Sequence, residues 1–367
     1  MIAVAGRRIT WTGVMPWLGL LALAATWGRA LSYPVAALVG LLMCGAVLAA
    51  VHHAEVVAHR VGEPFGSLVL AVAVTVIEVA LIVSMMVSGS GGKAATLARD
   101  TVFAAVMITT TGIVGISLLV GVVRRHTVVF HAEGAGGALA SVATLATLSL
   151  VLPTFTRGRA SNEFTPAQLT FAAVASVVLY GLFVLTQTIR HRDYFLPVDR
   201  GSGELIEEDR HAARPSGRAT LTSLGLLLMA LVGVVGLAKV ESPTIESVVA
   251  SADLPQAVVG VVIALLVLLP ETIAAVRAAA RDRLQISLNL AFGSALASIG
   301  LTIPVIAVAS IWLSGPLKLG LEPVHMVLLA IAVVVSMLTV VPGRATLLQA
   351  GLHLAVFASF LFLAVSP

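Results

Sequence analysis

The sequence predicts an all-α polytopic membrane protein of about 11 transmembrane helices, arranged as one N-terminal helix and two inverted five-helix repeats. The first observation is composition: 59% of the 367 residues are hydrophobic and 11% are charged, whereas about a quarter are charged in a soluble domain. The second is a series of apolar runs of bilayer length. The third is a pair of glutamates at matching places in the two halves.

Eleven apolar runs approach or exceed the roughly 20 residues that a helix needs to cross a bilayer. They lie near 14–28, 31–52, 65–89, 101–123, 137–155, 166–189, 220–239, 255–279, 285–313, 323–341 and 345–365. The first run follows Arg7 and Arg8 and ends in an Ala-x-Ala-like pattern, as a signal peptide does. Because ten further runs follow it, we interpret it as a retained first helix.

The basic residues predict how the chain crosses the membrane. Of 22 lysines and arginines, 15 precede the first run or fall in the loops after even-numbered runs, and 7 fall elsewhere. Cytoplasmic loops carry such an excess, so we expect a multi-pass protein of the cell inner (plasma) membrane with a cytoplasmic N-terminus and an external C-terminus. The net charge of +4 then reflects topology and not nucleic-acid binding.

The apolar runs divide the chain into four parts: an N-terminal helix at 1–30, a first repeat at 31–189, a cytoplasmic linker at 190–219 and a second repeat at 220–367. The linker contains "HRDYFLPVDRGSGELIEEDRHAARPSGR", whose Gly, Pro and mixed charge are typical of a flexible segment. A cation-sensing or regulatory loop is the alternative. An odd number of spans per half makes the halves point in opposite directions, which is a hallmark of secondary transporters.

Glu78 and Glu271 are the two acids that lie well inside apolar runs, in "GSLVLAVAVTVIEVALIVSMM" and "GVVIALLVLLPETIAAVRAAARD". An unpaired carboxylate at that depth costs about 2.5–3.5 kcal/mol on insertion scales. Each belongs to the second helix of its repeat, and each follows another glutamate at a similar distance, Glu55 and Glu246. Pro270 should break the second of these helices and free carbonyls that can coordinate a cation. The alternative is that both glutamates are protonated and structural.

Further oxygen ligands are available close to these glutamates and in the third helix of each repeat, in "MITTTGIVG" and "LNLAFGSALASIG". The predicted cation site comprises Glu78, Glu271, Thr75, Thr110, Thr111, Asn289 and Ser294. A Ca²⁺ ion takes six to eight oxygens, usually with carboxylates, and facing carboxylates also bind protons. Competition between a cation and protons for the same groups is the physical basis of antiport. The hydroxyls are equally explained by helix packing.

A polar segment, "VHHAEVVAHRVGEP", ends the second run on the cytoplasmic side. Because histidines titrate near neutral pH, it suggests a proton and cation pathway through His52, His53, Glu55, His59, Glu63 and Glu246. The zinc-protease pattern His-Glu-x-x-His is absent. The segment "SGSGGKAAT" has Val87 and Ala94 where a phosphate-binding loop needs Gly and Ser or Thr, which argues against ATP-driven transport.

The segments "AEVVAHRVGEPFGSLVLAVAVTVIEVALI" and "LPETIAAVRAAARDRLQISLNLAFGSALASIGLTIP" resemble the calcium/cation antiporter superfamily, specifically its CAX family and the bacterial ChaA-type cation/proton antiporters. The resemblance covers nearly the whole chain and places the central glutamates at Glu78 and Glu271. The usual Gly-Asn-Ala-x-Glu pattern is replaced by "AVTVIE", so the site has fewer polar ligands.

The resemblance implies a secondary-active exchanger with Ca²⁺/H⁺ exchange first and Na⁺/H⁺ or K⁺/H⁺ exchange as the alternative. It implies no enzyme activity and no cofactor. The expected partners are the lipid bilayer, cations and protons, with no nucleic acid, and a homo-oligomer is compatible with the sequence. A membrane-embedded enzyme using the carboxylate pair and a passive channel are the competing classes.

Overall fold

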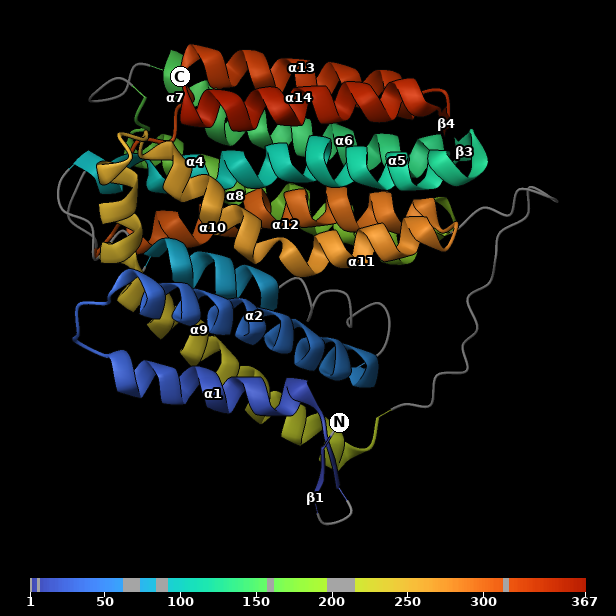
Figure 1. Ribbon diagram of the computed structural model, residues 1–367. Helices are drawn as coiled ribbons and strands as arrows, with labels where there is room; N and C mark the ends of the chain where they lie inside the picture. Colours follow the sequence, from blue (N-terminus) through green and yellow to red (C-terminus); the bar gives the residue numbers. More distant parts are fainter. Residues whose placement is uncertain are drawn as a thin grey trace.

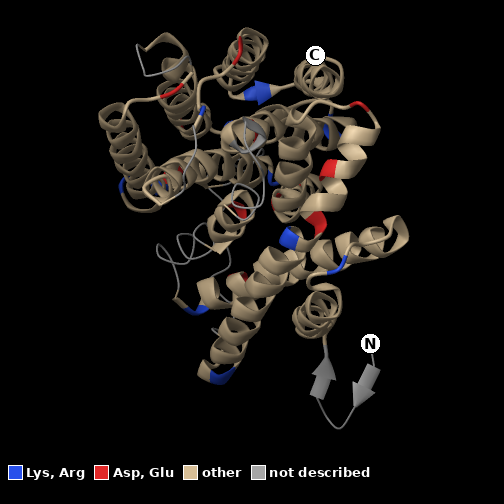
Figure 2. Cartoon of the chain, turned by 90° about the vertical axis from the view of Figure 1, so that its left-hand side faces the viewer, with Lys and Arg blue, Asp and Glu red and all other residues tan. Residues whose placement is uncertain are grey.

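The computed structural model describes residues 2–4, 7–61, 73–83, 92–156, 162–196, 215–312 and 317–367. The described chain is a bundle of long, roughly antiparallel helices with two short pairs of strands (Figure 1). Lys, Arg, Asp and Glu occupy few positions, and most of the chain consists of other residue types (Figure 2). Large apolar side chains such as Trp17, Leu41 and Phe171 are exposed on the helix surfaces, as expected of helices that contact lipid.

The elements follow the predicted runs closely. They are β1 (Ile2–Val4), β2 (Arg7–Ile9), α1 (Trp11–Thr26), α2 (Tyr33–Val61), the helix Ala73–Val83, α4 (Gly92–Met107), η1 (Ile108–Ile113), α5 (Val114–Arg125), β3 (Val128–Val129), α6 (Ala132–Ala146), η2 (Thr147–Val151), α7 (Leu152–Phe155), α8 (Pro166–Leu185), η3 (Thr186–Arg190), η4 (Arg192–Phe195), α9 (Gly217–Ser251), α10 (Ala257–Val267), α11 (Leu269–Ala280), α12 (Leu284–Ala309), α13 (Pro323–Val340), β4 (Arg344–Ala345) and α14 (Leu347–Val365). Strands β1 and β2 form one antiparallel pair, and β3 and β4 form another, with Val128 opposite Ala345.

Within the described residues, eight helical stretches are long and apolar enough to cross a membrane. A ninth span is the pair α10 and α11, which is bent by 54°. The shorter apolar helices α1 and Ala73–Val83 coincide with the two remaining predicted runs. Each of the 11 runs therefore corresponds to helical structure, which confirms an all-α polytopic membrane fold.

Corresponding helices of the two halves run in opposite directions (Figure 1). We call the side on which α8 ends and α9 begins the linker face, which is on the right in Figure 1, and the opposite side the far face. Helix α2 runs toward the linker face, whereas α9 packs against it and runs away. Helix α5 packs on α14, and α8 packs on α12, so the third helix of each half contacts the fifth helix of the other.

Most of the predicted linker, 197–214, lies outside the described residues. Its first residues fold back onto the bundle in η4, where the buried Phe195 ring packs edge-on against Phe183 with 5.9 Å between ring centroids. Burial of Phe195 fixes this end of the linker beside the helices that form the central cavity.

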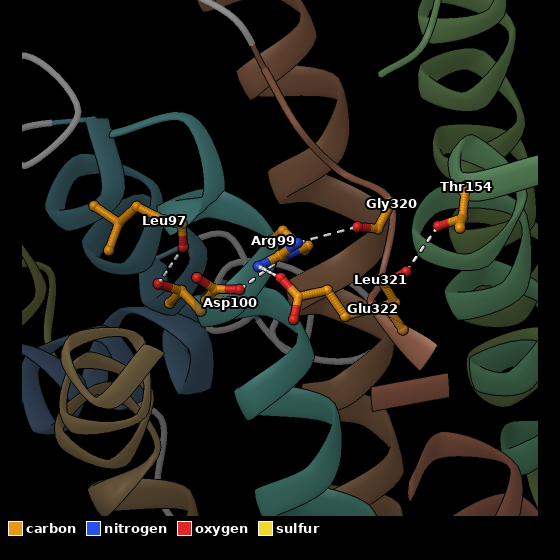
Figure 3. A network of polar contacts seen from close by, with 8 residues as sticks. Leu97, Arg99, Asp100, Thr154, Gly320, Leu321 and Glu322 are labelled. Carbon is orange, nitrogen blue, oxygen red and sulfur yellow. Dashed lines mark hydrogen bonds and ion pairs between the residues drawn. The ribbon is translucent and has the colours of Figure 1, made fainter. Parts of the chain in front are cut away.

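Arg99 of α4 forms a buried ion pair with its neighbour Asp100 and also contacts the segment before α13 on the far face (Figure 3). The Arg99 guanidinium donates to Asp100 Oδ1 at 2.7 Å, to the Gly320 carbonyl at 3.2 Å and to Glu322 Oε1 at 3.5 Å. Asp100 also marks the contact between α4 and the broken span, because a Cβ on Gly260 would lie 3.0 Å from the Asp100 backbone. Gly260 therefore permits α10 to approach α4 closely.

Candidate functional site

A cavity of about 220 Å³ lies between helix Ala73–Val83, α8, η3, α11 and α12. Glu78 and Glu271 both line it, although they come from different halves of the chain. Thr75, Asn289 and Ser294 line the same cavity. The residues that sequence reasoning placed in one site are thus brought together, with the exception of Thr110 and Thr111.

Glu78 is buried, with 4% of its surface exposed. Its Oε1 accepts a hydrogen bond from the Ser298 hydroxyl on α12. Ser298 is 2% exposed and also lines the cavity. This serine belongs to the polar segment of α12 noted in the sequence, but nothing in the sequence distinguished it from the other hydroxyls there.

Glu271 lies in the first turn of α11, directly after the break at Leu268. The break occurs where Pro270 was predicted to cause it, since proline has no N–H to donate to the carbonyl of Leu266. Among the described residues, no hydrogen-bond donor reaches the buried Oε2 of Glu271. Glu78 lines the same cavity as Glu271. A buried carboxylate in this setting is stabilised by a proton or by a bound cation.

Thr110 and Thr111 do not line the cavity, so the structure does not bring them together with the other predicted ligands. Both lie in η1, a π-helical turn within the third span of the first half. Their hydroxyls donate to the carbonyls of Val106 and Met107 in their own helix. The carbonyl of Thr110 bonds Nδ1 of the buried His353 at 2.9 Å. These threonines therefore belong to the packing of α5 against α14.

Asn289 lines the cavity, but both ends of its side-chain amide have protein partners. Its Nδ2 donates to the Phe195 carbonyl at 2.7 Å, and its Oδ1 accepts from Gln285 Nε2 at 2.9 Å. Asn289 thus attaches the start of the linker to the rim of the cavity, and its geometry suits this structural role better than cation binding.

A second cavity, of about 840 Å³, lies between α1, α2 and α11 toward the linker face. His52 and Glu55 line it together with Pro270 and Arg277 of α11. It therefore extends from the predicted polar pathway to the helix that carries Glu271.

The other predicted pathway residues are arranged differently. His53 is buried and donates from Nε2 to the Thr12 carbonyl at 3.0 Å, so it fastens α1 to α2. His59 is exposed near the end of α2, and Glu63 lies outside the described residues. Glu246 is partly exposed and accepts a hydrogen bond from Ser242 at 3.2 Å.

Residues 31–189 and 222–366 match the family model described as sodium/calcium exchanger protein. The chain belongs to this family. The match covers both halves and omits the N-terminal helix and the linker, the two parts that were predicted to lie outside the repeats.

Two curated relatives and one solved structure match this exchanger over almost its full length. It is 46% identical to the putative ionic transporter y4hA of Sinorhizobium fredii, with 97% of this chain and 96% of the relative covered. It is 33% identical to the sodium-potassium/proton antiporter ChaA of Escherichia coli, with 98% and 97% covered. The structure of native YfkE superposes with a TM-score of 0.69 at 18% identity, covering 97% of this chain and 99% of that one.

The family confirms the predicted class: this exchanger is a multi-pass membrane transporter that handles cations, and not an enzyme. It also confirms the resemblance to the calcium/cation antiporters and to their ChaA type. The similarity to YfkE confirms the fold.

We expect Ser298→Ala to weaken cation binding by this exchanger. Loss of a hydrogen bond to a charged group costs about 1.5–3 kcal/mol, and a carboxylate without this donor retains a proton more readily. The half-saturating cation concentration should rise roughly 10-fold at fixed pH. Ser287→Ala on the same helix is the control, since Ser287 is buried and its hydroxyl has no partner among the described residues. Equal behaviour of the two variants would contradict the prediction.

Proposed function

We propose that the protein is a secondary-active cation/proton antiporter whose shared binding site is formed by Glu78 and Glu271. The observation that carries this proposal is the convergence of two carboxylates from opposite halves on one cavity. Thr75, Ser294 and Ser298 add hydroxyl oxygens to that cavity. Two carboxylates there attract a cation when ionised and hold protons when neutral, so binding of one substrate displaces the other.

The second cavity supports an access route on the linker face. His52 and Glu55 lie at this cavity, and Pro270 on its wall immediately precedes Glu271. A cation or proton that enters there reaches the helix break at the centre of the second half. The far-face route opens in the alternate state, which is the general requirement of alternating access.

The two halves, 31–189 and 220–367, act as inverted repeats around this site, with the helix at 1–30 outside them. Two observations support this division: corresponding helices run in opposite directions, and the third helix of each half contacts the fifth helix of the other. We place the protein in the plasma membrane with the linker face and N-terminus in the cytoplasm, because the basic residues are concentrated on that side. Whether it forms a homo-oligomer stays a prediction.

Na⁺ and K⁺ are the first candidates for the cation. The relative that is 33% identical is named a sodium-potassium/proton antiporter, and the cavity wall is largely apolar apart from the two carboxylates and a few neutral oxygens. Ca²⁺ is the second candidate, because two ionised carboxylates balance its charge. It would take most of its six to eight oxygens from backbone carbonyls and water.

Proton-loaded everted vesicles that contain the protein test this function. Addition of Na⁺, K⁺ or Ca²⁺ in separate experiments should collapse the pH gradient, as read by a pH-sensitive dye, in vesicles with the protein and not in matched empty vesicles. Cation flux without proton movement, or proton movement without any cation, would contradict exchange. Comparison of the three cations at several pH values identifies the preferred substrate.

A further inference from the structure

Glu241 is a third buried carboxylate, and the mechanism above does not use it. It is 5% exposed on α9, and no donor among the described residues reaches its buried Oε1. A carboxylate within a membrane helix costs several kcal/mol unless it carries a proton or a counter-ion. Glu246, five residues later, already has a partner in Ser242 and is partly exposed.

The position of Glu241 connects it with the central site. It continues the buried stripe of α9 formed by Val234, Leu237 and Ala238. That stripe packs in the same apolar cluster as Ile77 and Leu81, the neighbours of Glu78 in sequence and along its helix. Glu241 therefore lies on the side of α9 whose apolar residues share a cluster with the helix that carries Glu78.

The depth of Glu241 places it on the far-face side. Helix α9 begins at the linker face and continues for 35 residues. Glu241 is 24 residues beyond its first residue, Gly217, or roughly 36 Å along the axis. On the other side of the same turns, Lys239, Pro243 and Ser247 line a cavity of about 570 Å³ that reaches the loop between α1 and α2.

A proline interrupts the hydrogen bonding of α9 close to Glu241. Pro243 lies inside α9 and cannot donate to the carbonyl four residues earlier, at Lys239. Lys239 and Pro243 line the cavity on the opposite face of α9, so this interruption lies behind Glu241 and leaves its carboxylate as the cation-binding group. Glu55 is the carboxylate on the first helix of the first half, and it lines the linker-face cavity.

We propose that Glu241 transiently binds cations and protons on the far-face side of the transport route, as they pass between the Glu78–Glu271 cavity and that side of the membrane. The inference rests on the proposed exchange function. One carboxylate then lies on each side of the central pair, Glu55 toward the linker face and Glu241 toward the far face.

Transport measured from each face separately tests the assignment. In vesicles of both orientations, identified by antibody access to an N-terminal epitope tag, Glu241→Gln should raise the half-saturating Na⁺, K⁺ or Ca²⁺ concentration at least about fivefold from the far face. The value from the linker face should stay within about twofold of wild type. Glu55→Gln should give the reverse pattern, and Glu133→Gln, which changes a side chain 65% exposed at the start of α6, should give neither. An equal effect of Glu241→Gln on both faces, or no effect on either, would overturn the proposal.

A chemical measurement decides the point independently of transport. Dicyclohexylcarbodiimide adds to protonated carboxyl groups in apolar surroundings and leaves a stable acylurea that mass spectrometry assigns to a residue. It should label Glu241, and excess Na⁺, K⁺ or Ca²⁺ should reduce that labelling. Cation-independent labelling, or none, would overturn the role of Glu241, even if Glu78 and Glu271 are protected. Loss of protection at Glu78 and Glu271 instead would indicate failure of the proposed exchange site.

Discussion

Glu78→Gln and Glu271→Gln should each abolish coupled exchange while leaving the protein in the membrane. Each substitution keeps the shape of the side chain but removes one of the two charges that line the cavity. Removal of one partner from a buried charged interaction costs about 2–5 kcal/mol, which corresponds to at least roughly a 30-fold loss of cation affinity. The expected readout is a pH gradient in everted vesicles that no longer responds to Na⁺, K⁺ or Ca²⁺.

Matched controls separate loss of the site from loss of the fold. Glu78→Asp and Glu271→Asp keep the charge and should retain part of the exchange. Glu133→Gln removes an exposed carboxylate at the start of α6 and should transport as wild type does. Full exchange by both central glutamine variants would exclude the proposed site, and loss of exchange by Glu133→Gln would show that the assay reports a general effect of charge.

The sequence predicted the membrane helices and the central pair because both depend on local composition. A run of about 20 apolar residues has few alternatives to a spanning helix, and a glutamate inside such a run stands out. The break before Glu271 was equally predictable, since Pro270 cannot continue the hydrogen-bond ladder. Local composition therefore predicts both the membrane spans and the glutamates and proline that stand out within them.

Which side chains point at the glutamates depends on the rotation of each helix about its axis. Amino-acid composition does not specify that rotation. The threonines of η1 and the serines of α12 look alike in sequence. The π-helical turn and back-bonding hold Thr110 and Thr111 within their own helix, whereas Ser298 points at Glu78. The tight contact between Tyr180 and Gly300, where a Cβ would lie 2.7 Å from the tyrosine side chain, shows how closely α8 constrains the face that α12 presents.

Glu241 was missed for a different reason. The apolar run that predicted α9 ends near 239, where charge and Pro243 indicate a helix end. The helix instead continues through Pro243 to Ser251, so Glu241 lies within it. Tertiary packing against α2 and α10 sustains a helix that local propensity would terminate.

The second large effect is expected in the Arg99 network of Figure 3, where Arg99→Met should destabilise the protein strongly. The side chains of Arg99 and Asp100 are 5% and 6% exposed, so removal of the guanidinium leaves the Asp100 carboxylate buried without its counter-ion. Breaking a buried pair in this way costs about 3–5 kcal/mol. The variant should lose its folded peak in detergent at a temperature lower by roughly 5–15 °C.

The exposed pair between Arg125 and Asp282 provides the matched control for Arg99→Met. Its side chains are 55% and 34% exposed at a separation of 3.4 Å, so Arg125→Met should cost no more than about 1 kcal/mol. The double variant Arg99→Met/Asp100→Leu should recover much of the lost stability, because replacing a whole buried pair with apolar groups is often neutral. Equal melting temperatures for Arg99→Met and Arg125→Met would show that the network does not hold α4 to α13. A double variant no better than the single one would instead assign the loss to the Arg99 contacts with the Gly320 carbonyl and Glu322.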